Sequence, residues 1–273
     1  MFIDINQTDL HPLLEFVFQK YTFDFRGYSL NTLKRRVERF VKLFGLRNIH
    51  ELIQLLENNP AIFDTFRNEL TVNTTEMFRD ETFWRAIKQE IIPQLALKKE
   101  IRIWHNGCST GEEVYSLAIL LENVGILDKA SITATDINTE ALKTATKGEY
   151  KKRYVDIYNE NYKKIYSTTS SIYDYGTPTD GDKFQFNSRL RNKINFHYFD
   201  DIQGYSEEIY DLILSRNVLI YFTMGLQNQV MSKLFHNLNH NGYIAFGIKE
   251  NLTWSSSFKY LKEFNSENKI YQK

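Results

Sequence analysis

Apolar residues recur at helical spacing through the first hundred residues. One stripe follows the intervals i, i+4, i+7, i+8 and i+11, and its members are Leu33, Val37, Phe40, Val41 and Phe44. This spacing predicts an amphipathic helix that ends near Gly45. Similar spacing predicts helices over 49–57 and 61–70, and another over 83–91 that Pro93 ends or kinks. The first part of the chain is therefore predicted to be all-α.

After residue 100 short apolar runs alternate with helical patterns. Strands are predicted over 101–104, 131–135, 194–199, 211–215 and 242–247. Helices are predicted over 112–123, from Thr139, and over 227–238. Such alternation is typical of an α/β fold with a mostly parallel sheet covered by helices. Residues 258–261 and 269–271, separated by a polar turn, predict a closing hairpin.

These patterns predict three parts of the chain. Residues 1–70 form a helical domain, 71–98 a linker with a connecting helix, and 99–273 the α/β domain. Residues 148–193 are too long and polar for an ordinary connection, which takes about 2–6 residues. They predict a subdomain inserted into the α/β domain.

Composition narrows the class of protein. The 273 residues carry 34 Lys and Arg against 34 Asp and Glu, so the absence of excess positive charge argues against a nucleic-acid binder. Gly and Pro number only 12 and 4, which favours a globular chain over a disordered one. With Cys108 as the single cysteine, no signal segment at Met1 and no apolar stretch of about 18 residues, we expect a cytoplasmic protein without membrane insertion.

Positive charge is concentrated on one side of the helix that begins near Leu33. Between positions 26 and 47 the only acidic residue is Glu38, and the basic ones are Arg26, Lys34, Arg35, Arg36, Arg39, Lys42 and Arg47. Two interpretations remain open. The helix presents either an ordinary solvated face or a docking surface for an acidic partner.

Residues 106–113, Asn-Gly-Cys-Ser-Thr-Gly-Glu-Glu, join the first strand to the next helix. The carboxyl end of a strand that enters a glycine turn and a helix start is where α/β proteins bind ligands. The spacing of Gly107 and Gly111 differs from the dinucleotide fingerprint, and Glu112 and Glu113 would repel a pyrophosphate. The loop therefore favours a cofactor with a cationic end. In the alternative interpretation, the glycines serve only the turn and the glutamates the helix dipole.

The same loop also matches the G-x-S-x-G nucleophile elbow of hydrolases through Gly107, Ser109 and Gly111. A catalytic triad would then draw its other members from Asp200, Asp211, His236 and His240. The hydrolase sheet normally places several strands before its elbow, whereas helices precede this one. The hydrolase is thus the less favoured alternative.

Asp136 ends the second predicted strand, 29 residues after Gly107. A carboxylate there can accept hydrogen bonds from both hydroxyls of a ribose, although such acids are also common helix caps. Together with the loop, Asp136 favours a ligand that carries adenosine. The histidines, with a single cysteine, show no metal-ligand spacing, so no metal is expected.

Four blocks in order resemble one family, the CheR-type protein-glutamate O-methyltransferases of bacterial chemotaxis. They are residues 70–80, 108–116, 134–140 and 214–222. The resemblance implies a small all-α domain followed by a Rossmann-like class I methyltransferase domain that uses S-adenosylmethionine and releases S-adenosylhomocysteine. This cofactor has no phosphate and carries an amino group and a sulfonium, which agrees with glutamates following the glycines.

The resemblance also implies a set of site residues. Cofactor-binding residues would be Asn73, Thr75, Arg79, Gly107, Glu113 (at the amino group), Asp136 (at the ribose), Asp200 and Asp201 (at the adenine), Arg216 and Asn217. Arg79 and Tyr221 would be catalytic. Taken alone, Arg79 would be a surface ion-pair residue, Asn217 a turn residue and Tyr221 a core aromatic. His105-Asn106, where the family has small residues, and Lys249-Glu250, where Ser-Glu is common, depart from the pattern and point to a narrower pocket or a changed acceptor.

The implied activity is methyl transfer to glutamate carboxylates of chemoreceptors, carried out by a monomer. The acidic helical bundle of the receptor would dock on Arg35, Arg36, Arg39 and Lys42. Two alternatives stay open: a methyltransferase with another acceptor, and a regulatory module that binds the cofactor without catalysis.

Overall fold

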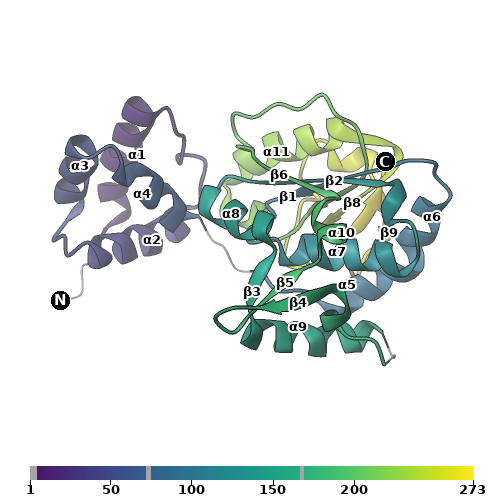
Figure 1. Cartoon of the computed structure of the whole chain (residues 1–273). Coiled ribbons are helices and arrows are strands. Elements are labelled where there is room, and N and C mark those ends of the chain that lie inside the picture. Colours follow the sequence, from purple (N-terminus) through teal and green to yellow (C-terminus); the bar gives the residue numbers. More distant parts are fainter. Residues whose placement is uncertain (1–4, 72–74, 167–168) are drawn as a thin grey trace.

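The computed structural model describes residues 5–71, 75–166 and 169–273. Four helices occupy the amino-terminal side of the molecule (Figure 1): α1 (Gln7–Tyr21), α2 (Leu30–Leu43), α3 (Ile49–Asn58) and α4 (Ile62–Leu70). The predicted stripe of α2 is confirmed for Leu33, Val37, Phe40 and Val41, which are all buried, but not for Phe44, which lies just past the end of the helix and is 36% exposed. These apolar faces pack on one another, and the charged side of α2 is left toward solvent.

A seven-stranded sheet forms the centre of the second half. Its strands are β1 (Ile101–Asn106), β2 (Ala130–Asp136), β6 (Ile194–Tyr198), β7 (Tyr210–Ser215), β8 (Leu238–Phe246), β9 (Lys262–Asn265) and β10 (Ile270–Gln272). The spatial order is β6-β2-β1-β7-β8-β10-β9. The first five are parallel neighbours, while β10 is antiparallel to both β8 and β9. The predicted α/β class with a preceding all-α region is confirmed.

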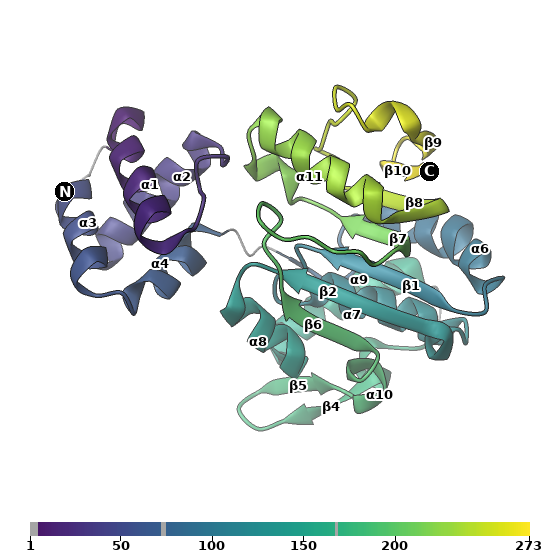
Figure 2. The same ribbon diagram turned by 90° about the horizontal axis from the view of Figure 1, so that it is seen from above.

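Helices cover both faces of this sheet (Figure 2). They include α7 (Glu112–Asn123), α8 (Thr139–Lys147), α10 (Ser188–Arg191) and α11 (Met224–Asn237). Neighbouring residues of β1 point to opposite faces of the sheet. Ile103 packs in the core shared with α7 and the helix over 81–96, and Trp104 packs in the core shared with α11 and the amino-terminal helices. Strand alternation thus supplies two hydrophobic layers.

The connecting helix is interrupted before Pro93. It consists of α5 (Glu81–Ala86), one π-helical segment (Ile87–Ile91) and α6 (Ile92–Ala96). Pro93 lies in the first turn of α6, where a missing backbone N–H leaves no regular helix bond unmade. The predicted interruption is therefore a π-turn.

Residues 148–193 carry their own small sheet. It contains β3 (Glu149–Lys151), β4 (Gly176–Thr179) and β5 (Lys183–Phe186) in the antiparallel order β3-β5-β4, with α9 (Lys152–Ile165) beside it. Phe186 stacks on Tyr115 of α7 with 4.7 Å between ring centroids. Aromatic packing therefore attaches this sheet to the α7 side of the fold (Figure 1).

The closing hairpin begins later than the sequence predicts. Residues Phe258–Tyr260 form a 3-10 turn, and β9 starts only at Lys262. The apolar residues of 258–261 pack against the core from the turn, while the edge strand β9 is largely exposed and has no alternating apolar pattern. The expectation of a strand over 258–261 is wrong for that reason.

Backbone hydrogen bonds attach the amino-terminal helices to the carboxyl ends of the sheet strands. Ser29 N donates to Tyr221 O at 2.8 Å, Thr223 N donates to Gly27 O at 2.8 Å, and Tyr28 forms an antiparallel bridge with Phe222. Asn138 Nδ2 donates to Thr71 Oγ1 at 2.9 Å. Within the described ranges, we find no helix with the length and apolar character that crossing a bilayer requires.

Candidate functional site

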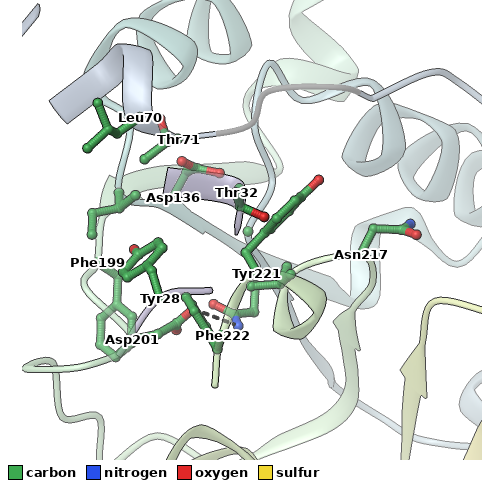
Figure 3. A pocket seen from close by; sticks show the side chains of 14 residues that line it. Tyr28, Thr32, Leu70, Thr71, Asp136, Phe199, Asp201, Asn217, Tyr221 and Phe222 are labelled. Atoms are coloured by element: carbon green, nitrogen blue, oxygen red, sulfur yellow. Dashed lines mark hydrogen bonds between the residues drawn. The ribbon is translucent and has the colours of Figure 1, made fainter. Parts of the chain in front are cut away.

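A cavity lies where the strand order changes direction, between β1 and β7 (Figure 3). The space between its walls is about 670 Å³ when the open solvent at its mouth is included, and about 80 Å³ is open to the centre of a water molecule. Its walls come from the ends of β1 and β2, the segment after β6, the connection from β7 to α11, and the amino-terminal helices. The lining residues are Tyr28, Thr32, Leu70, Thr71, Asn106, Gly107, Asp136, Ile137, Phe199, Asp201, Asn217, Val218, Tyr221 and Phe222. A switch point of this kind is the usual ligand site of a doubly wound sheet.

The turn after β1 requires its glycines. Gly107 has φ +68° and Gly111 has φ +91°, values that favour glycine. A Cβ on Gly107 would lie 2.3 Å from Cγ2 of Val218, so the backbone there passes close to the opposite wall. Ser109 has φ +50°, and Cys108 N donates to Thr135 O at 2.9 Å. Strand pairing and glycine together bring this backbone into the cavity.

Asp136 is buried at the end of β2 and holds the glycine turn. Its Oδ2 accepts a 2.7 Å hydrogen bond from Ser109 N, and its Oδ1 accepts one of 2.8 Å from Asn138 N. Burial raises the pKa of the carboxyl, while these backbone donors act in the opposite direction. Asp136 therefore holds the glycine turn and the backbone of Asn138, the N-cap of α8, and it also faces the cavity (Figure 3).

Glu113 belongs to a buried ionic group behind the turn. Its Oε2 lies 2.9 Å from Arg216 Nη1, and Arg216 Nη2 lies 2.6 Å from Oδ2 of Asp80. Burial would raise the pKa of Glu113, but the charge of Arg216 and the neighbouring His105 hold it at about 2. Glu113 Oε1 has no hydrogen-bond partner within the described ranges and lies 3.3 Å from His105 Nε2. This oxygen of the buried carboxylate therefore faces His105, whose Nε2 can donate to it when that nitrogen carries the proton.

Asp200 and Asp201 both follow β6, but only Asp201 lines the cavity. Asp201 lines the cavity, and its Oδ2 accepts a 3.2 Å hydrogen bond from Asn106 Nδ2. Burial raises the pKa of Asp201 to about 7. Asp200 does not line the cavity. Its Oδ1 accepts from the backbone N of Ile202 at 2.8 Å and closes the turn instead.

Tyr221 forms the wall opposite Asp136 (Figure 3). It is half-buried, and burial raises the pKa of its phenol although the positive charges of Arg36 and Arg79 oppose that rise. The connection that carries it is held by Glu250, whose carboxylate accepts from Asn217 N at 3.0 Å and Leu219 N at 2.8 Å. Asn217 itself has φ +59°.

The structure brings part of the predicted set together. Gly107, Asp136, Asp201, Asn217 and Tyr221 line one cavity, and Glu113 and Arg216 form an ion pair behind it. The residues that do not line it are Thr75, Arg79 and Asp200, although the charge of Arg79 acts on Tyr221. Asn73 lies outside the described residues. No cluster of three metal-ligating side chains occurs among the residues described.

Sequence reasoning missed the contribution of the amino-terminal helices. Tyr28, Thr32, Leu70 and Thr71 line the cavity together with residues of the sheet. Tyr28 packs edge-on against Phe222, with 5.0 Å between the ring centroids. No local pattern marks Tyr28, because its partners lie almost two hundred positions away. For Asn106, the only signal in the sequence is its departure from the family pattern.

The hydrolase alternative has no support in the geometry. Ser109 Oγ is buried and, within the part of the chain that is described, has no hydrogen-bond partner. His236 lines a separate cavity beside Trp104 and Lys233. A triad requires a histidine hydrogen-bonded to the serine, so Ser109 is a turn residue here.

The site fits a cofactor with an ammonium group and an adenosine. Glu113 places a buried carboxylate behind the glycine turn, which suits a cation, and the carboxylates of Asp136 and Asp201 in the cavity suit hydroxyl and amino donors. A Rossmann-like sheet with such a site at its switch point defines an S-adenosylmethionine-dependent methyltransferase.

Comparison with known proteins gives the family. Residues 73–265 match the model of the CheR methyltransferase SAM-binding domain, and residues 8–71 match that of the CheR all-alpha domain. The chain belongs to the CheR methyltransferase family. S-adenosylmethionine is its cofactor.

Relatives span nearly the whole chain. The putative methyltransferase Cher3 of Pseudomonas putida is 33% identical, covering 97% of this chain and 96% of its own. A chemotaxis protein methyltransferase of Listeria innocua is 31% identical over 84% of each chain, and one of Borreliella burgdorferi is 27% identical over 95% of this chain and 93% of its own. Among solved structures, the N-methyltransferase NodS of Bradyrhizobium japonicum with S-adenosyl-L-homocysteine matches with a TM-score of 0.41 and 14% identity, covering 80% of this chain and 96% of that one.

Proposed function

We propose that the protein methylates glutamate carboxylates of chemoreceptors and thereby serves chemotaxis. The proposal is supported by family membership and by relatives in Listeria innocua and Borreliella burgdorferi that are named chemotaxis protein methyltransferases. The observation that carries it is the cavity that runs from the glycine turn to Tyr221 beside the basic helix α2.

For the cofactor we propose one role for each wall of the cavity. Asp136 accepts hydrogen bonds from the ribose hydroxyls, Asp201 faces the adenine, and Glu113 Oε1 accepts from the methionyl amino group. Asp200 then acts by closing the turn that presents Asp201. Further contacts are proposed for Asn73, Thr75, Arg79, Gly107, Arg216 and Asn217.

Bound S-adenosylmethionine would supply a methyl group on a sulfonium. A glutamate carboxylate oxygen would take that methyl group as its bond to sulfur breaks, and S-adenosylhomocysteine would be the leaving group. An ordinary glutamate has a pKa of about 4.3, so the acceptor is ionised at neutral pH and needs no general base. Tyr221 is suited to donate a hydrogen bond, since burial raises its pKa and keeps the phenol protonated. Arg79 would hold a carboxylate nearby. Alignment and exclusion of water would then provide most of the acceleration.

Helix α2 is proposed as the docking surface for the acidic receptor bundle. Arg35, Arg39 and Lys42 are exposed, and Arg36 is partly buried. The positive charges of Arg35 and Arg36 act on the Tyr221 phenol, so this face flanks the mouth where the acceptor would enter. Arg39 lies 3.4 Å from Glu69, which weakens its own contribution.

The decisive experiment is transfer of a tritiated methyl group from S-adenosylmethionine to purified receptor fragments. Label that is released by mild base identifies a glutamyl ester and supports the proposal. Base-stable label would point to another acceptor chemistry. Absence of label, together with measurable binding of S-adenosylhomocysteine, would indicate a regulatory module without catalysis.

A further inference from the structure

Asn106 lies at the carboxyl end of β1 and is only 2% exposed. Its side-chain amide is the centre of a buried polar network. Nδ2 donates to Asp201 Oδ2 and to Ser215 Oγ, both at 3.2 Å. Oδ1 accepts from Thr135 Oγ1 at 3.5 Å, and Thr135 in turn accepts from Trp104 Nε1 at 2.9 Å. Both polar atoms of the Asn106 side chain are therefore hydrogen-bonded, and these bonds fix the orientation of its amide.

Asp201 and Asn106 both line the cavity, and Asp201 is the charged member of this network there (Figure 3). Its segment is held from behind by Lys233 of α11, whose ammonium donates to the carbonyls of Asp201, Ile202 and Gly204 at 2.7–2.9 Å. The backbone of Asp201 is thus anchored by Lys233, and Asn106 contacts the side chain.

We propose that Asn106 is a positioning residue, whose amide keeps the Asp201 carboxylate in place as a hydrogen-bond acceptor for an amino group of the bound cofactor. The inference rests on the proposed function, because it deepens the role of the same cavity. A side-chain N–H that donates to a carboxylate stabilises the ionised form, and only that form accepts from an amino group through both oxygens.

Burial and the charged groups around Asp201 place its ionisation near neutral pH, so the hydrogen bond from Asn106 affects whether Asp201 is charged there. Burial raises the pKa of Asp201 to about 7, with Asp200 and Asp136 acting in the same direction and Asn106 and Lys233 opposing them. Tyr28, which faces the same acids from the amino-terminal helices, has its own pKa raised by burial and stays neutral. Asn106 is the group among these that bonds Asp201 Oδ2 directly.

The test is the affinity for S-adenosylhomocysteine between pH 6 and pH 9, measured by calorimetry on the full chain. In the unmodified protein, affinity is expected to be highest above pH 7 and to fall as Asp201 takes up a proton. Asn106→Ala should bind S-adenosylhomocysteine about tenfold more weakly than the unmodified protein at pH 7, and the difference should be much smaller at pH 9. The reason is that loss of the donor raises the pKa of Asp201 and so moves the midpoint of the affinity curve to higher pH.

Two variants make the result specific. Ser215→Ala removes the other acceptor of Asn106 Nδ2 but leaves the bond to Asp201, so its midpoint should stay at that of the unmodified protein. Asp201→Asn should remove the pH dependence of the affinity that arises from protonation of Asp201. Any pH dependence that remains is assigned to Asp136. Combining Asp201→Asn with Asn106→Ala should add no further movement of the midpoint.

A uniform loss of affinity at every pH in Asn106→Ala would overturn the inference and indicate a packing role or a direct contact with the ligand. The same shift in Ser215→Ala would also overturn it. Thermal unfolding at each pH separates these outcomes from a failure to fold. Failure of the proposed function is distinguishable, since it appears as binding of S-adenosylhomocysteine without transfer to receptor fragments.

Discussion

The catalytic roles proposed for Tyr221 and Arg79 each depend on one polar group, the phenol of Tyr221 and the guanidinium of Arg79. Tyr221 lines the cavity, and its phenol is kept protonated by burial, whereas Arg79 acts on it through charge from outside the cavity wall. In the proposed mechanism neither contributes a nucleophile or a base. Both would orient an acceptor carboxylate, which is an interaction that matters most during transfer.

We expect Tyr221→Phe to lower kcat about tenfold or more while changing the affinity for S-adenosylhomocysteine by less than about threefold, because only the donor is removed. Arg79→Ala should also lower kcat by a larger factor than it lowers the affinity for S-adenosylhomocysteine. The measurement compares kcat on a receptor fragment with Kd for S-adenosylhomocysteine. Equal losses in both quantities would contradict the assignment.

Glu112 gives a prediction about stability. It is buried at the start of α7, accepts from Thr110 Oγ1 at 2.6 Å and Tyr158 OH at 3.2 Å, and burial raises its pKa to about 7. An acid whose pKa is raised by folding destabilises the native state increasingly as pH rises from the unfolded pKa to the folded one. Glu112→Gln should therefore increase the free energy of unfolding by about 1–3 kcal/mol at pH 8 and by little at pH 5.

Denaturant unfolding of the cofactor-free protein at both pH values checks this. A gain of equal size at pH 5 and pH 8 would mean that the charge of Glu112 is not the cause.

At the scale of elements, the turn between β1 and α7 shows which glycines matter. Gly107 combines a φ of +68° with a close approach to Val218. Gly45 has a φ of +65° and open space, because none of the described residues places an atom within 4 Å of where its Cβ would stand. The two positions share the backbone conformation and differ only in crowding. They form a matched pair for substitution.

Gly45→Ala should cost about 1–2 kcal/mol of unfolding free energy from the left-handed backbone alone. Gly107→Ala should cost more and should weaken binding of S-adenosylhomocysteine at least about tenfold, because stiff β-branched Val218 must move into the cavity. Denaturant unfolding and calorimetry measure the two effects. Unchanged affinity in Gly107→Ala would show that the turn does not shape the site.

At the scale of the whole molecule, the cavity belongs to both halves of the chain. Backbone bonds from Ser29 and Thr223 join α2 to the connection that carries Tyr221. Thr32, in the first turn of α2, lines the cavity, and the basic residues follow on the next turns. One helix thus carries both a residue that lines the cavity and the basic residues of the proposed docking surface.

Reversing Arg35, Arg36 and Arg39 to Glu together should reduce methylation of a receptor fragment at least about tenfold at low salt and leave Kd for S-adenosylhomocysteine nearly unchanged. The control reverses three exposed lysines elsewhere, Lys99, Lys129 and Lys262, with the same change in net charge. Loss of methylation in the control as well would assign the effect to net charge. Full activity of the α2 variant at moderate salt would refute docking on this face.

The sequence by itself determined the periodic parts of this protein. Alternating apolar runs specify the strands, the α2 stripe specifies its buried face, and the glycine turn with its two glutamates specifies a cationic cofactor at the end of β1, because each of these depends on neighbours in the chain. Only the tertiary structure decided that Tyr28 and Thr32 form part of the cavity, that Asp201 rather than Asp200 faces it, and that Asn106 holds Asp201. Those contacts join residues far apart in sequence, and packing across the sheet, not local spacing, selects them.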